Sequence, residues 1–219
     1  MTALEVADWR RRTHALYAAV RSNPDAASAH ADWRAARNKM FATHPASPLM
    51  LDDRRDFAGL PFGDYDPAWR FEAAIVPGAD RLGESRPGES PSGAGRRITV
   101  ETGTDGVVPF DLLGTVTIDA VGSLDVWRLA SYGGGIFVPV KDALSRVSGG
   151  TYGGGRYLID TVKGADLGPG SLPESLVLDF NFAYNPSCAY DPAWACPLAQ
   201  PGNTVAGQVP VGERYRASA

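Results

Sequence analysis

The sequence is poor in cysteine, with only Cys188 and Cys196 among 219 residues. Two thiols cannot build the disulfide framework of a small secreted protein, and in a reducing cytosol they stay as thiols. The chain also has no continuous apolar run of about 18 residues, which a transmembrane helix requires. Its charged beginning does not match a signal peptide either. These absences predict a soluble, cytoplasmic protein.

A strong net charge is absent as well. The chain has 21 basic and 25 acidic residues, and its formal net charge is -4. Proteins that bind phosphate backbones or anionic membranes usually carry a broad basic field. The charge balance therefore predicts neither nucleic acid nor a membrane as a partner, and it does not define an oligomeric state.

The familiar catalytic motifs are missing too. The sequence contains no paired-carboxylate motif, no G-x-S-x-G motif, and no phosphate-loop or dinucleotide-binding motif. Their absence excludes the easily recognised enzyme classes and identifies no cofactor. Whether the chain is an enzyme is left open at this stage.

Glycine and proline are abundant instead, with 25 and 17 residues, both above average. This composition favours a β-rich fold with many turns between short strands. Two helices are expected before that part. The first covers residues 3–21, where apolar side chains recur on one helical face. Asn23 and Pro24 would then cap and begin a second helix, which must end before Pro45 and leave His44 extended.

Seven runs with strand propensity follow, separated by turn signals such as Asp105-Gly106. They are residues 70–76, 97–101, 107–119, 123–130, 135–141, 156–162 and 175–184. Neighbouring runs should pair as antiparallel hairpins. Residues 77–95, which are almost without apolar side chains, should form a loop between two of them.

The predicted fold class is mainly β (α+β). We expect an antiparallel β-barrel or sandwich of about seven or more short strands, preceded by two N-terminal helices. Residues 1–43 would be the N-terminal helical segment and residues 44–219 the β-rich domain. We expect the two parts to pack together as a single domain, since the chain length suits one core.

The last run, residues 175–184, alternates between two kinds of side chain. One face carries Leu176, Leu178, Phe180, Phe182 and Tyr184. The other face carries Asp179 and Asn181, because successive strand residues point to opposite sides. The first face predicts a core contact, and the second either meets solvent or lines a polar cavity.

Arg156 begins the neighbouring run, directly after three glycines. If the two runs lie side by side, Arg156 could pair with Asp179 or Asn181, and the glycines would let a ligand approach the backbone. The alternative is a structural ion pair with glycines that serve only the turn. On the first interpretation the ligand-binding candidates are Tyr152, Arg156, Asp179, Asn181 and Cys188.

The two cysteines have seven residues between them. This spacing matches neither a zinc knuckle nor the two-residue redox motif. A zinc site formed with His44 and Asp191, or a nucleophilic cysteine activated by His44, are alternatives that the spacing does not support. We expect no metal site, and we expect Cys188 to be a partly protected, unreactive thiol among aromatic side chains, namely Tyr184, Tyr190 and Trp194.

Two stretches, TYGGGRYL at residues 151–158 and LDFNFAYNPSCAYDPAWACPL at residues 178–198, resemble a known family. Asn203 and the triplet GER at residues 212–214 extend the likeness, as do weaker echoes at Arg37, Lys39, Phe41 and residues 47–49. The family is the bacterial and archaeal domain-of-unknown-function 1684 family. The resemblance implies a family without an assigned activity, so no catalytic residue can be carried over from it.

These observations lead to two functional hypotheses. In the first, the chain is a cytosolic, barrel-like protein with a pocket for a small polar or anionic metabolite, which it binds or acts on as an enzyme. A flavin-binding split barrel is a variant by fold analogy alone. In the second, the chain is a non-catalytic structural or protein-interaction module.

Overall fold

The fold begins with two helices, as the sequence predicted. The computed structural model describes residues 1–77, 96–102 and 106–215. The first helix, α1, covers Ala3–Ser22 and starts with a capping box, in which Thr2 and Glu5 each bond the other's backbone N–H. Such a box satisfies two N–H groups that the first turn would otherwise leave without partners. Neither helix in the described ranges is long and apolar enough to cross a membrane.

The second helix, α2, covers Ala26–Thr43, and its cap differs from the prediction. Asp25, not Asn23, is the N-cap, and its carboxylate accepts the N–H groups of Ala27 and Ser28 at 3.1 and 3.3 Å. Asn23 ends α1 instead, and its side chain accepts the N–H of Asp25 at 2.9 Å. A carboxylate near the helix N-terminus gains from the helix dipole, which an amide does not. His44 ends α2 in an extended conformation, as expected.

The strands form two antiparallel sheets. The larger sheet has the order β2-β4-β5-β6-β7, with β3 also paired to β4, and the smaller sheet pairs β1 with β8. The strands are β1 (Arg70–Ala74), β2 (Val76–Pro77), β3 (Arg97–Thr102), β4 (Gly106–Ile118), β5 (Gly122–Leu129), β6 (Ile136–Val140), β7 (Arg156–Asp160) and β8 (Ser175–Asp179). The predicted fold class is confirmed in its sandwich form, since the described sheets do not close into a barrel. The loop predicted at residues 77–95 lies, apart from Pro77, outside the described residues.

The last strand is shorter than its alternation predicted. β8 ends at Asp179, and residues Phe180–Phe182 form a 3-10 turn. The Asp179 carboxylate accepts the N–H of Asn181 at 3.0 Å and so starts this turn. Asp and Asn side chains favour such local bonds over the strand ladder. As a result, Asn181 is as buried as the two phenylalanines beside it.

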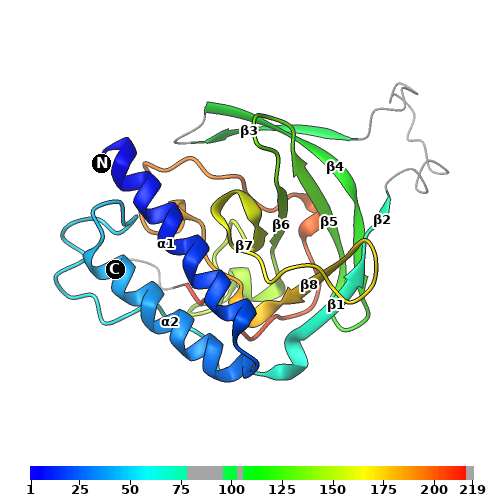
Figure 1. The fold of residues 1–219 in the computed structure, drawn as a ribbon, viewed down its shortest axis with the longest axis horizontal. Helices are drawn as coiled ribbons and strands as arrows, with labels where there is room; N and C mark the ends of the chain where they lie inside the picture. The colour runs from blue at the N-terminus through cyan, green and yellow to red at the C-terminus, as the bar shows by residue number, and fades with distance from the viewer. Residues whose placement is uncertain (78–95, 103–105, 216–219) are drawn as a thin grey trace.

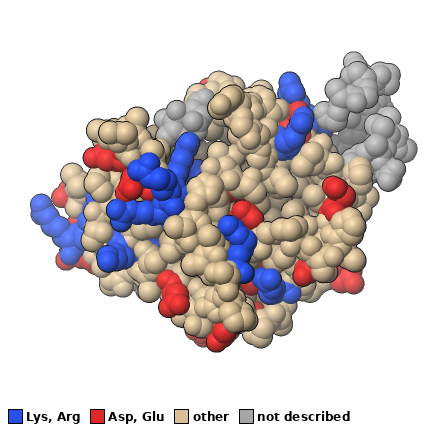
Figure 2. All heavy atoms as spheres, in the orientation of Figure 1, with Lys and Arg blue, Asp and Glu red and all other residues tan. Residues whose placement is uncertain are grey.

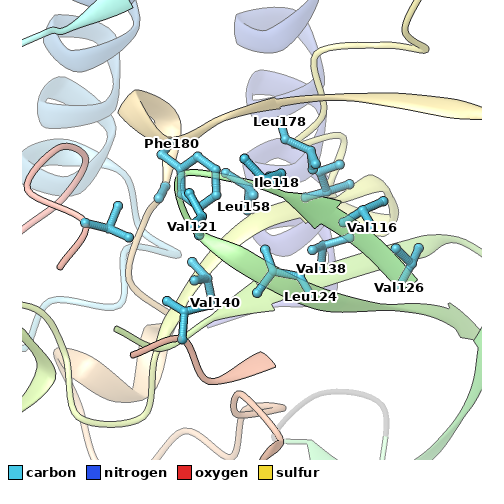
Figure 3. Close-up of a cluster of buried hydrophobic side chains, with 14 of the residues drawn as sticks. Val116, Ile118, Val121, Leu124, Val126, Val138, Val140, Leu158, Leu178 and Phe180 are labelled. Carbon is cyan, nitrogen blue, oxygen red and sulfur yellow. The ribbon is translucent and has the colours of Figure 1, made fainter. Parts of the chain in front are cut away.

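Both faces of the large sheet contribute side chains to buried clusters. On one face, Val116, Leu124 and Leu158 pack with Leu178 and Phe180 from the small sheet and the turn after it (Figure 3). On the other face, an aromatic cluster joins the helices to the sheet through Tyr17, Trp33, Trp127, Phe137 and Tyr157. In Figure 1, α1 and α2 lie side by side on one flank, and the long strand β4 curves along the opposite flank.

Candidate functional site

The buried Arg156 is bound by groups of the protein through both of its terminal nitrogens, and its Nε has no partner among the residues described. Its guanidinium donates to Asp142 at 2.7 Å and to the backbone carbonyls of Val211 and Val209 at 2.5 and 3.2 Å. The predicted pairing with Asp179 or Asn181 is wrong. Strand register gives the reason: Arg156 lies opposite Val140 on β6, so Asp142, two residues further on, reaches the same edge.

Asp179 and Asn181 form a second, separate group. The Asn181 side chain donates to the Asp66 carbonyl at 2.9 Å and accepts the Asp66 N–H at the same distance. Arg70 lies 3.5 Å from the Asp179 carboxylate, and burial raises the pKa of that carboxyl. Asp179 and Asn181 are 1% and 0% exposed, which excludes the solvated strand face. The pair binds the loop before β1 to the small sheet, and its role with a ligand stays a prediction.

His30, on α2, extends this group and was not identified from the sequence. Its Nε2 lies 2.9 Å from the Asn181 carbonyl, so the neutral ring donates this hydrogen bond. Aromatic rings surround it, with Phe182 and Trp33 at 5.1 and 5.8 Å between ring centres. Burial lowers the pKa of His30 from 6.5 to about 4. A sequence signal for it is the helical spacing of His30 and Trp33 on one face.

The neutral His30 makes stability depend on pH in a defined window. Because the pKa of His30 is lower in the folded state than in the unfolded chain, its contribution is complete above about pH 6.5 and is lost as the pH falls through about 4. We expect the free energy of unfolding in urea to fall between about pH 7 and pH 5, and to fall less in His30→Gln. Glutamine keeps an N–H donor but does not titrate.

The matched control for this prediction is His14→Gln, which changes an exposed histidine on α1. It should keep the pH dependence of the natural chain. Equal losses of stability in the natural chain and in His30→Gln over this window would show that His30 does not titrate with unfolding.

Tyr152 and Cys188, two of the candidates from the sequence, lie next to each other. The Tyr152 hydroxyl lies 3.4 Å from the Cys188 carbonyl, to which it donates, and 3.7 Å from the Cys188 sulfur. The ring of Tyr152 packs on Tyr215 at 5.0 Å between centres. The interaction with the Cys196 thiol and the burial of the side chain both raise the pKa of Cys188.

Cys196 has the opposite electrostatics. The interaction with the Cys188 thiol lowers the pKa of Cys196 while burial raises it, and the backbone N–H groups of Cys188 and Ser187 and the charge of Lys163 also lower it. Thiolates are stabilised by such donors and by nearby positive charge. Sequence reasoning did not select Cys196.

His44 is not a partner of either cysteine. Its Nε2 lies 3.0 Å from the Asp8 carboxylate, and its Nδ1 accepts the N–H of Ala46 at 3.0 Å. Both ring nitrogens are thus occupied, so the hypothesis that His44 activates a cysteine is wrong. In the part of the chain that the structure describes, no group of three His, Cys, Asp or Glu side chains could hold a metal ion.

A cavity of about 500 Å³ lies where α1, the large sheet and the segment of residues 185–197, here called the cysteine loop, meet. Its wall is mostly apolar and includes Val6, Trp9, Val108, Phe110, Leu129, Phe137 and Trp194. Its polar groups include Cys196 and the ion pair of Lys163 and Asp160, 3.3 Å apart. None of the five candidates from the sequence lines it. The wall comes from segments far apart in the chain, so no local motif could have found it.

A smaller recess of about 40 Å³ adjoins this cavity, and Trp9, Pro48, Lys163 and Ser187 line both. Tyr17, Arg37 and Asn185 also line the recess. The Tyr17 hydroxyl, the Arg37 Nε and the Asn185 Oδ1 are buried and have no hydrogen-bond partner among the residues described. Buried polar atoms are nearly always satisfied, so three together mark a place for a polar group.

Comparison with known proteins agrees with the resemblance in the sequence. The chain matches the family described as "Protein of unknown function (DUF1684)" over residues 55–214. No curated protein matches it. It is similar to the solution NMR structure of an uncharacterized protein from Haloarcula marismortui, at 30% identity and a TM-score of 0.54, over 83% of this chain and 89% of that chain. The chain therefore belongs to the DUF1684 family.

Proposed function

We propose that the chain binds a small amphipathic molecule, with its apolar body in the cavity and a hydroxyl-type end in the adjoining recess. The observation that carries this proposal is the junction of an apolar cavity with three buried, unpartnered polar atoms. The cavity volume of about 500 Å³ supports it, since small-molecule sites usually measure about 300–1,000 Å³.

The recess favours a ligand whose polar end is neutral over a ligand whose polar end is ionised. Tyr17 and Arg37 offer two donors, and Asn185 offers one acceptor. A hydroxyl group accepts two hydrogen bonds and donates one, so it complements this set. Arg37 is already paired with the Glu213 carboxylate at 3.0 Å, so a second carboxylate would meet no uncompensated positive charge. The sequence predicts a small polar or anionic metabolite; the present proposal keeps a polar end, drops the anionic option and adds an apolar body.

The distribution of surface charge also supports a small, weakly charged ligand. Figure 2 shows a face that is mostly uncharged, with basic and acidic side chains interspersed over it. Macromolecular polyanions are held by extended basic surfaces. The proposal of no nucleic-acid partner is consistent with this face.

Filling the cavity should abolish binding. Leu129, at the end of β5, lines the cavity, and Leu129→Trp would place an indole inside it. We expect N-phenylnaphthylamine, a neutral apolar dye, to fluoresce on binding the natural chain, and its Kd to rise at least about ten-fold in Leu129→Trp, which is 1.4 kcal/mol. Dye titration followed by fluorescence measures this.

Leu172→Trp makes the same change at a side chain that is 66% exposed, and it should leave dye binding unaltered. Octanol should displace the dye better than heptyl methyl ether, because the two have equal numbers of heavy atoms but only octanol can donate to Asn185. Dye binding that is absent from the natural chain, or equal in both variants, would contradict the proposal. Either result would favour the alternative hypothesis that the chain is a non-catalytic structural or protein-interaction module.

A further inference from the structure

Strand β3 has one edge that no other strand covers. It pairs with β4 alone, and no second strand lies beside it in the part of the chain that the structure describes. In Figure 1 it lies at the rim of the molecule, on the side away from α2. The N–H and C=O groups of such an edge can pair with a strand of another chain. β3 therefore offers backbone groups on which a second strand can pair.

The register with β4 shows which groups of β3 face this edge. Antiparallel strands alternate between residues that exchange backbone hydrogen bonds with the partner and residues that do not. The N–H of Leu112 donates to the carbonyl of Arg96 at 2.8 Å, so every second residue from Arg96 onward bonds β4. The residues between them point their N–H and C=O groups to the free edge: Arg97, Thr99 and Glu101.

Pro109 supports this assignment independently. It lies opposite Thr99 in the register, and proline has no backbone N–H. Its carbonyl accepts the N–H of Ala130 at 2.8 Å, on the β5 side of β4. Pro109 therefore makes no backbone bond to Thr99, whose own N–H and C=O groups point away from β4.

The side chains of β3 are arranged so that the strand complements a second copy of itself. Arg97, Thr99 and Glu101 are exposed, while Ile98 and Val100 are half-buried against the aromatic cluster. If two copies pair antiparallel about Thr99, Arg97 of each copy lies opposite Glu101 of the other. Opposite charges placed so stabilise a strand pair, and like charges destabilise it. A parallel pairing in register would instead place arginine beside arginine and glutamate beside glutamate.

Arg97 already ends a row of alternating charges within the chain. Arg128 on β5 lies 3.0 Å from the Asp111 carboxylate on β4, and the same carboxylate lies 2.6 Å from Arg97. Glu101, in contrast, lies opposite Val107, which carries no charge. A second copy would continue the row with a carboxylate beside Arg97, and it would give Glu101 an opposite charge across the strands.

We propose that the chain forms a symmetric homodimer in which the two β3 strands pair antiparallel about Thr99 and join the two large sheets. A two-fold axis at Thr99 makes every contact occur twice, as an interface between identical surfaces requires. This inference does not depend on the proposed ligand. One strand pair is a small interface, so we expect the dimer to form between about 10 µM and about 1 mM protein.

Sedimentation equilibrium of the full chain tests the dimer. We expect the mean mass to rise from the 23.2 kDa of the monomer toward twice that value as the concentration increases through this range. Thr99→Pro removes the N–H on the axis and leaves the bonds to β4 in place, because proline is tolerated at edge positions whose N–H faces solvent. This variant should stay monomeric at every concentration.

Glu101→Arg keeps the proposal falsifiable if Thr99→Pro fails to fold. Its neighbour within the chain is Val107, so the monomer should fold as before, but the dimer would have like charges opposite each other at both ends of the strand pair. We expect the Kd of the dimer to rise at least about ten-fold. Asp119→Arg makes the same change of charge in the exposed turn between β4 and β5, and it should leave the Kd unaltered.

The outcomes that would overturn the proposal are equally definite. A natural chain that stays monomeric up to about 1 mM would show that the edge of β3 does not pair with a second copy. A dimer with the same Kd in Glu101→Arg and in Asp119→Arg would form through another surface.

Discussion

Replacing Arg156 by methionine is expected to lower the free energy of unfolding by about 3–5 kcal/mol, the usual cost of breaking a buried ion pair. The guanidinium is fully buried, and its loss leaves the Asp142 carboxylate 1% exposed without its cation. The Asp142 side chain would keep only the N–H of Leu144 and the hydroxyl of Thr151 as donors. The carbonyls of Val209 and Val211 would also lose their donor. Urea unfolding followed by circular dichroism measures the loss.

The control is Arg97→Met, which removes the same side chain from an exposed pair with Asp111 at 2.6 Å. Exposed ion pairs contribute little because water and salt screen them, so this variant should change stability far less. The double variant Arg156→Met, Asp142→Leu should recover most of the loss, since it removes both buried charges together. If Arg156→Met and Arg97→Met lowered the free energy of unfolding by similar amounts, the buried network would not be what stabilises the fold.

Arg156 shows which features of the candidate site can be predicted from the sequence and which cannot. An arginine that begins an apolar strand after three glycines is a clear local signal, and it did identify a buried charge. Its partner depends on which strand lies alongside, and that order is a property of the folded sheet. β7 pairs with β6, so the carboxylate is Asp142; β8 pairs with β1, which takes Asp179 out of reach.

The end of β8 shows a second limit. Phe180 and Phe182 continue the two-residue alternation of the strand, yet they lie in a 3-10 turn started by the Asp179 side chain. An alternation with a period of two over so few residues fits a continuous strand, and it fits equally well a shorter strand followed by one turn. The pattern therefore cannot distinguish the two. The two helices and the long strand β4 were predictable because their patterns extend over many residues.

The cavity illustrates a third limit, which concerns long-range assembly. Val6 comes from α1, Phe137 from β6 and Cys196 from the cysteine loop, and each looks ordinary in its own segment. The sequence directed attention to Cys188 and its neighbours. In the folded chain Cys196 lines the cavity and Cys188 does not.

The triplet GER, which is part of the family resemblance, now has a physical role that leads to the second large effect. Glu213 is fully buried, and its carboxylate accepts from Arg37 at 3.0 Å, from the N–H of Asn185 at 3.1 Å and from the Tyr190 hydroxyl. One side chain thus joins α2, the polar recess and the cysteine loop. Glu213→Gln keeps the shape but leaves the Arg37 guanidinium buried without a counter-charge, so we expect a loss of about 3 kcal/mol in the free energy of unfolding.

The same substitution should also raise the reactivity of Cys188 in the cysteine loop. Because Tyr190 is anchored on the carboxylate, a weaker anchor should let the loop open more often, and Cys188 should be alkylated faster while the chain remains folded. The matched control is Glu72→Gln, an exposed carboxylate on β1 that binds Ser171, which should alter stability far less and leave Cys188 unchanged. If Glu213→Gln lost stability without exposing Cys188, the anchor would stabilise the fold but would not protect Cys188.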